Sequence, residues 1–337
     1  MTRSRSGEDG APERFRYGFV ASSDNHAARP GTGFKQIDPV RHMDVRGELP
    51  WPLNRVMARR AEMEDPRRPV LPAASDAGAL GTDARVTSFL YPGGLVAVHA
   101  AGRSREAIWD ALQRREVYGT SGPRIGLWFE LLNAPGAPAP MGSAHALAEP
   151  PRFEVRAVGS FEPAPGCPET SFAALSPEKL ARLCNGECEH PSDRRRTIAA
   201  IEVVRIRPQQ GLDEAVEALI EDPWRRFACA PDPSGCTVAF DDPEFVAAGR
   251  DALYYVRALE EPSLAQNGRP LSTRFDADGN AVEVTLCSGA RIDAGGCPAS
   301  VSERAWSSPI FVNLKKGTEL GLQEFAPSRS APRRSSR

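Results

Sequence analysis

The sequence predicts an α/β fold in two parts, with β/α units in residues 14–125 and a β-rich domain with helical insertions in residues 126–312. Two short apolar runs, 17–21 and 95–100, are too short for helices and indicate buried strands. The second run is followed by a helix and then another strand. After residue 125 the chain changes to short apolar segments separated by loops rich in Pro and Gly, which is typical of a β-rich domain.

The helix of the first part is predicted over about three turns, ending at Arg114 and Arg115. Ser104 is a favourable N-cap residue, and Glu106 in the first turn complements the helix dipole. Four apolar residues recur at helical spacing: Ala107, Ile108, Ala111 and Leu112. The order strand, helix, strand is the order expected of β/α units.

Further elements are predicted from apolar runs and helix-start signals. Strands are expected at residues 126–132, 153–161, 198–207, 252–259 and 281–286. Helices are expected at residues 53–64, at 176–184 with Pro177 in the first helical position, and as a short segment at 212–220. The terminal stretches 1–13 and 313–337 are polar and rich in Arg and Ser, so we expect both to be disordered.

The charge pattern does not favour a nucleic-acid partner. The chain carries 42 basic and 44 acidic residues, which are mixed along its length and form no basic stripe with interleaved aromatic residues. No apolar run approaches the roughly 18 residues that suggest a transmembrane helix. The polar N-terminus lacks the apolar core of a signal peptide, so the chain taken literally is cytoplasmic.

The seven cysteines, all after residue 166, indicate an oxidising compartment instead. Three pairs are close in sequence and lie among loop residues: Cys184/Cys188, Cys229/Cys236 and Cys287/Cys297. We expect Cys229–Cys236 and Cys287–Cys297 as local disulfides, with free core thiols and zinc ligation as alternatives. The unpaired cysteine is expected to be Cys167 or one of the first pair. Disulfides without a signal peptide would fit a chain that is the C-terminal part of a longer exported protein.

Asp24 and His26 follow the first predicted strand and stand two residues apart. Residues two apart in extended backbone point to the same side. A carboxylate and an imidazole placed in this way can both bind a divalent metal, and active sites of α/β proteins lie beyond the carboxyl ends of their strands. A solvated loop containing the same pair is the alternative reading.

The residues around Asp24 and His26 form a longer motif. Ser22-Ser23-Asp24-Asn25-His26, continued by Ala27 to Gly33, resembles the last metal-binding motif of the PHP (polymerase and histidinol phosphatase) superfamily. It is more closely similar to a bacterial family of PHP-like proteins known only as a domain of unknown function. Two other regions resemble the same family, namely 93–124 and the pair 254–258 with 303–310, so the resemblance runs from about residue 14 to 312.

The resemblance implies the C-terminal portion of a distorted PHP-type β/α barrel, followed by the β-rich domain. It also implies a metal-dependent hydrolase of a small-molecule phosphate or related ester, with Asp24 and His26 as ligands of zinc or manganese. The sequence departs from the family because no His-x-His is present. A catalytic metal needs at least three protein ligands, so we expect weak metal binding and an incomplete hydrolase in this chain.

Other residues could complete the site. His42 and Asp44 repeat the spacing of two in the following loop, and His99 ends the second strand. The alternatives are an exposed loop pair and a strand-end histidine bound to backbone. Arg29 and Lys35 flank the ligand loop and could hold an anionic group, or could be surface charges.

Two classes of function remain open at this level. The first is a PHP-type hydrolase of which this chain is part. The second is a non-catalytic remnant or binding module built on the β-rich domain. The two classes differ in whether metal is required.

Overall fold

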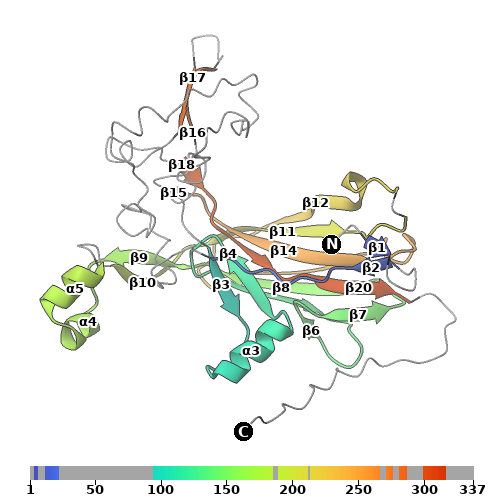
Figure 1. Ribbon diagram of the computed structural model, residues 1–337, viewed down its shortest axis with the longest axis horizontal. Coiled ribbons are helices and arrows are strands. Elements are labelled where there is room, and N and C mark those ends of the chain that lie inside the picture. Colours follow the sequence, from blue (N-terminus) through green and yellow to red (C-terminus); the bar gives the residue numbers. More distant parts are fainter. Residues whose placement is uncertain are drawn as a thin grey trace, which may run out of the picture.

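The computed structural model describes residues 4–6, 12–22, 94–184, 189–211, 213–265, 271–275, 281–286 and 299–315 (Figure 1). This part of the chain is mixed α/β, with many strands and few helices. Its strands form open sheets and no closed barrel, so the predicted PHP-type barrel is not confirmed.

Two sheets make up the body of the molecule. The larger has eight strands in the order β12-β11-β14-β19-β4-β3, with β20 pairing with both β14 and β7. Its strands are β3 (Leu95–Val98), β4 (Val117–Thr120), β7 (Ala144–Leu147), β11 (Ile198–Ile206), β12 (Ile220–Ala228), β14 (Ala252–Glu260), β19 (Arg304–Ser307) and β20 (Ile310–Leu314). The smaller sheet has the order β13-β8-β5-β6, from β5 (Gly126–Leu131), β6 (Ala139–Pro140), β8 (Arg152–Val158) and β13 (Cys236–Asp241).

The hydrophobic core lies between these sheets. Along β8 every second residue is buried, which places Phe153 on the inner face with Val155 and Ala157. The Phe153 ring lies 4.7 Å from the ring of Tyr254 on β14, and both side chains are fully buried. The central strands β11 and β14, which the sequence predicted as strands, are buried along most of their length.

Helix α3 (Arg105–Gln113) begins where the sequence predicted. Ser104 Oγ accepts a hydrogen bond from the amide of Ala107 at 3.1 Å, and Glu106 lies in the first turn. The helix nevertheless does not belong to a parallel β/α unit, because β3 and β4 pair antiparallel with Leu95 opposite Thr120. Parallel neighbours require a crossover back to the starting end of the sheet. Here Arg115, with a φ of 61°, turns the chain directly into β4.

The predicted buried strand at 17–21 is wrong. This segment is described but pairs with no strand, and Tyr17 and Val20 are 49% and 68% exposed. The amide of Phe19 donates to the Oγ of Ser308 at 3.0 Å. A side chain therefore accepts a hydrogen bond that a neighbouring strand's carbonyl would accept in a sheet.

The later predictions were mostly correct. The strands expected near 126, 153, 198, 252 and 281 correspond to β5, β8, β11, β14 and β17 (Ala281–Leu286). The helix expected at 176–184 is α5 (Pro177–Cys184). The short helix expected at 212–220 is wrong, because only the 3-10 turn Glu217–Leu219 forms before β12 starts at Ile220. The helix predicted at 53–64 lies outside the described residues.

The remaining elements are small additions to the sheets. A hairpin of β9 (Phe161–Pro165) and β10 (Glu189–Arg195) projects from the body and carries α4 (Glu169–Ala174) and α5 at its tip (Figure 1). Three further antiparallel pairs join β1 (Ser4–Ser6) to β2 (Pro12–Arg14), β15 (Ser263–Ala265) to β18 (Ala299–Val301), and β16 (Leu271–Phe275) to β17.

Strands from both sides of the predicted domain boundary at 125/126 share the larger sheet. Strand β4 precedes that boundary and pairs with β19, which follows it. The buried cluster likewise extends from Tyr118 to Val312. The boundary itself stays a prediction.

Candidate functional site

The predicted metal ligands Asp24 and His26 lie outside the described residues, as do Arg29, Lys35, His42 and Asp44. Within the described ranges, no group of three or more His, Cys, Asp or Glu side chains is arranged to hold a metal ion.

The chain segment that leads into the predicted ligand string is described as far as Ser22. Small residues make room for it beside β3 and β4. A Cβ atom on Gly94 would lie 2.6 Å from the Cβ of Ala21, and one on Gly119 would lie 3.0 Å from the same atom. Segment 17–22 therefore passes over the β3–β4 pair and reaches its Gly94 end, where β4 leads into the turn at Ser121.

His99 lies at the other end of β3. Its amide donates to the Glu116 carbonyl at 2.9 Å, and its Nε2 hydrogen-bonds to the Leu127 carbonyl at 2.9 Å. A carbonyl only accepts, so Nε2 carries the proton and Nδ1 is left as the possible ligand atom. Five residue steps along an extended strand separate His99 from Gly94, roughly 17 Å. The structure thus does not bring His99 to the end of β3 that Ser22 reaches.

The described residues do bring together a buried carboxyl pair, formed by Glu260 at the end of β14 and Glu303 just before β19. Glu260 is 0% exposed and Glu303 is 5% exposed. The amide of Glu260 donates to the Glu303 carbonyl at 2.8 Å. Because Leu259 pairs with Arg304, the two glutamates occupy directly opposed positions on neighbouring chain segments.

Two serines bind this carboxyl pair. The amide of Ser160 donates to Glu260 Oε1 at 2.6 Å, and the hydroxyl of Ser121 donates to Glu303 Oε2. The Oε2 atom of Glu260 is buried and has no hydrogen-bond partner among the described residues. The carboxyl pair therefore lies next to the turn after β4, at the same end of the sheet as Ser22.

Burial raises the pKa of both carboxyls above the ordinary value for glutamate. For Glu260, desolvation is the largest cause, opposed by the hydrogen bond from Ser160 and by the charge of Arg196. For Glu303, desolvation is again the largest cause and the negative charge of Glu260 adds to it, while the hydrogen bond from Ser121 opposes both. A group with a raised pKa in a polar cluster is a candidate for proton chemistry.

The sequence analysis did not single out either glutamate. Glu303 lies within the region 303–310 that resembles the PHP-like family, but nothing else in the sequence was a reason to predict a role for it. Glu260 directly follows the apolar strand predicted at 252–259. A carboxylate at the end of a mostly apolar strand was the available signal.

A second charged cluster surrounds Arg205 on β11, which is 2% exposed. Its guanidinium donates to Asp242 at 2.8 Å, to Glu221 at 2.6 Å and to Glu244 at 2.8 Å. Burial raises the pKa of Tyr254 well above its ordinary value, so its hydroxyl stays protonated and donates to Asp242 Oδ2 at 2.6 Å. Every nitrogen of this guanidinium has a partner, so we interpret the cluster as structural.

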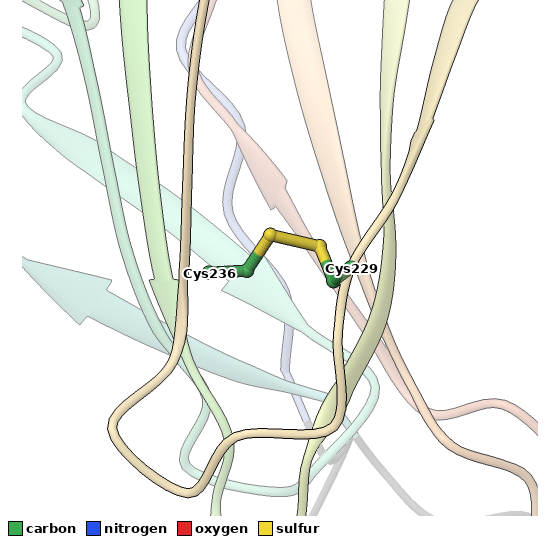
Figure 2. The surroundings of a disulfide bond; sticks show 2 residues. All are labelled: Cys229 and Cys236. Carbon is green, nitrogen blue, oxygen red and sulfur yellow. A yellow bond between two sulfur atoms is a disulfide. The ribbon is translucent and has the colours of Figure 1, made fainter.

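The predicted disulfide between Cys229 and Cys236 is confirmed, with the two Cα atoms 5.9 Å apart (Figure 2). It joins the segment after β12 to the first residue of β13, and these strands belong to different sheets. Cys167 is also disulfide-bonded, so it is not the unpaired cysteine. Cys287 and Cys297 lie outside the described residues.

None of the helices in the described part of the chain has the length and apolar character needed to cross a membrane.

Comparison with known proteins gives one match. Residues 8–130 match the model of a family described as "Protein of unknown function (DUF3604)". The matched part includes β3, α3, β4 and the segment that leads into the predicted ligand string. No curated protein and no solved structure matches the chain. The expected resemblance to a domain of unknown function is therefore confirmed for this part of the chain.

Proposed function

We propose that this chain is part of a metal-dependent hydrolase of the PHP type, which acts on a phosphate or a related ester. The observation that carries the proposal is the string Ser22 to His26, in which a carboxylate and an imidazole are spaced to bind one metal. Two findings support it. The family match covers this string. The described segment that leads into the string ends at Ser22, close to the turn that follows β4.

The predicted pair Asp24 and His26 does not by itself complete such a site. Asp24 and His26 provide two ligands, whereas a catalytic metal needs at least three from the protein. A bound zinc or manganese would supply an acidic water and would stabilise negative charge on the ester. The contribution of this chain would be two of the ligands, with Arg29 or Lys35 to bind an anionic substrate.

Metal binding and ester hydrolysis test the proposal in two steps. The 337-residue chain should bind zinc or manganese weakly, and Asp24→Asn or His26→Ala should weaken binding further, as measured by calorimetry. Asp38→Asn changes a carboxylate that is close in sequence but is not a predicted ligand, so it should leave binding unchanged. Tight stoichiometric metal that persists in His26→Ala would contradict the ligand assignment.

Activity is tested with a longer protein if the DNA directly upstream of the Met1 codon encodes a His-x-His strand. That protein should release product from phosphate or sulfate esters when zinc or manganese is added. Asp24→Asn and His26→Ala should abolish turnover, and Asp38→Asn should not. An extended protein that binds metal but hydrolyses none of these esters would favour the binding module instead.

The proposal also concerns the cellular compartment of the protein. We propose that the protein is exported, because disulfides persist in oxidising compartments. The Cys229–Cys236 bond and the bonded state of Cys167 support this.

A further inference from the structure

We propose that Glu260 and Glu303 share a proton, which makes the junction of β14, β19 and the Ser121 turn sensitive to pH. The proposal concerns the carboxyl pair defined above and does not depend on the predicted metal loop. It rests on the position, burial and hydrogen bonds of the two side chains.

The backbone places the two glutamates directly opposite each other. Glu260 follows the β14–β19 ladder, in which Leu259 pairs with Arg304, and its amide bonds to the Glu303 carbonyl at 2.8 Å. Opposed residues of antiparallel chains project to the same face, with Cβ atoms about 5 Å apart. Two like charges in this arrangement destabilise the pair, and the cost is larger when both groups are buried.

The hydrogen bonds around the pair leave one carboxyl oxygen without a donor. Each carboxyl already accepts from a serine, Glu260 Oε1 from the Ser160 amide and Glu303 Oε2 from the Ser121 hydroxyl. Oε2 of Glu260 is buried without a partner among the described residues. A proton on this carboxyl removes one of the two charges and converts the unpartnered acceptor into a donor.

The charged groups around the pair only partly offset the two negative charges. Arg196, between β10 and β11, and Arg304 on β19 are the neighbouring cations. Neither forms an ion pair with Glu260 or Glu303 in the described part of the chain. Both arginines are partly exposed, whereas the two glutamates are buried. Desolvation therefore outweighs their attraction and raises the pKa of both carboxyls.

The sign of the effect on stability follows from linkage. A carboxyl whose pKa is raised on folding contributes stability that is fully present below its unfolded value, about 4.3 for glutamate. That stability is lost as the pH rises through the folded-state pKa. While the folded protein retains one more proton than the unfolded chain, the folding equilibrium constant falls by about tenfold per pH unit.

The experiment compares urea unfolding of the full oxidised chain from pH 4 to pH 9 with that of Glu260→Gln. Glutamine imitates the protonated carboxyl without titrating. The ratio of the folding equilibrium constants, variant over wild type, should therefore increase with pH, and Glu303→Gln should change it in the same direction. Glu261→Gln is the matched control, because Glu261 is the neighbouring residue and is exposed. Its ratio should stay constant.

Carbon-13 titration of the wild-type carboxyl groups gives an independent measurement that does not require a variant to fold. At least one glutamate of the wild-type protein should titrate above the ordinary range. The proposal is overturned if Glu260→Gln and wild type lose stability in parallel across the pH range. It is also overturned if millimolar Ca²⁺ or Mn²⁺ stabilises wild type at pH 8 but not Glu260→Gln, because the pair would then hold a cation.

Discussion

At the scale of single residues, a buried charge is tolerated in this protein when its partners are arranged around it. Arg205 is 2% exposed and Asp242 is 1% exposed. The guanidinium contacts both oxygens of Asp242, and it also lies over the Trp224 ring with Cζ 4.3 Å from the centroid. The opposite charges of the two residues compensate each other, and Glu221 and Glu244 also accept hydrogen bonds from the guanidinium.

We therefore expect Arg205→Met to destabilise the protein by about 3–5 kcal/mol, because it leaves Asp242 buried without a cation. Arg226 pairs with Glu202 on the same sheet, but its side chain is 54% exposed. Arg226→Met should cost no more than about 1 kcal/mol. Urea unfolding of the two variants at pH 7 makes the comparison. Equal losses would show that Asp242 does not depend on Arg205.

At the scale of elements, the passage from β12 to β13 connects the two sheets. The chain leaves the edge of the larger sheet after β12 and enters the edge of the smaller sheet at Cys236. Cys229–Cys236 closes this passage with a sequence separation of 7 (Figure 2). The disulfide therefore fixes two strands that share no ladder of backbone hydrogen bonds.

Replacing both cysteines, as Cys229→Ser with Cys236→Ser, should lower the stability by roughly 2–3 kcal/mol. A loop of this length loses only a modest amount of entropy in the unfolded chain when it is closed. Thermal and urea unfolding without reductant measure the difference. Wild-type protein treated with reductant cannot replace the double variant in this experiment, because the reductant would also break the disulfide bond of Cys167. An unchanged unfolding midpoint would mean that packing alone holds the two strands.

At the scale of the whole molecule, the β3–α3–β4 segment is a part of the larger sheet. Strand β4 pairs with β19, and Val117 and Tyr118 are 2% and 7% exposed. The hydroxyl of Ser308, between β19 and β20, also donates to the Val117 carbonyl at 2.6 Å. Strand β4 and the β19–β20 region, which are far apart in the sequence, thus stabilise each other.

A chain of residues 126–315 should consequently be less stable than a chain of residues 94–315. Removal of β3, α3 and β4 exposes one edge of β19 and removes the buried side chains of Val117 and Tyr118. Burial of two such side chains contributes roughly 3–6 kcal/mol. Urea unfolding of the two chains tests this. Equal stability would support an independent domain that begins at residue 126, as the sequence predicted.

The features that could be predicted from the sequence are those that depend on residues close together in the chain. The start of α3 was predictable because Ser104 satisfies the amide of Ala107, three residues away. The strands β11 and β14 were predictable because their residues are apolar along most of the strand. Cys229–Cys236 was predictable because its partners are close in sequence. The assignment of Asp24 and His26 stays a prediction, since these residues lie outside the described part of the chain.

Which segments lie side by side depends on contacts between distant parts of the chain. Segment 17–21 is apolar enough for a strand, yet it packs over Gly94 and Gly119 without joining the sheet. The order strand, helix, strand is compatible with either direction of pairing, and only contact between β3 and β4 makes it antiparallel. The carboxyl pair depends on the meeting of β14 with β19, and the Ser121 hydroxyl that binds Glu303 comes from 182 residues away. Contacts across such separations depend on the fold as a whole, so a local pattern does not encode them.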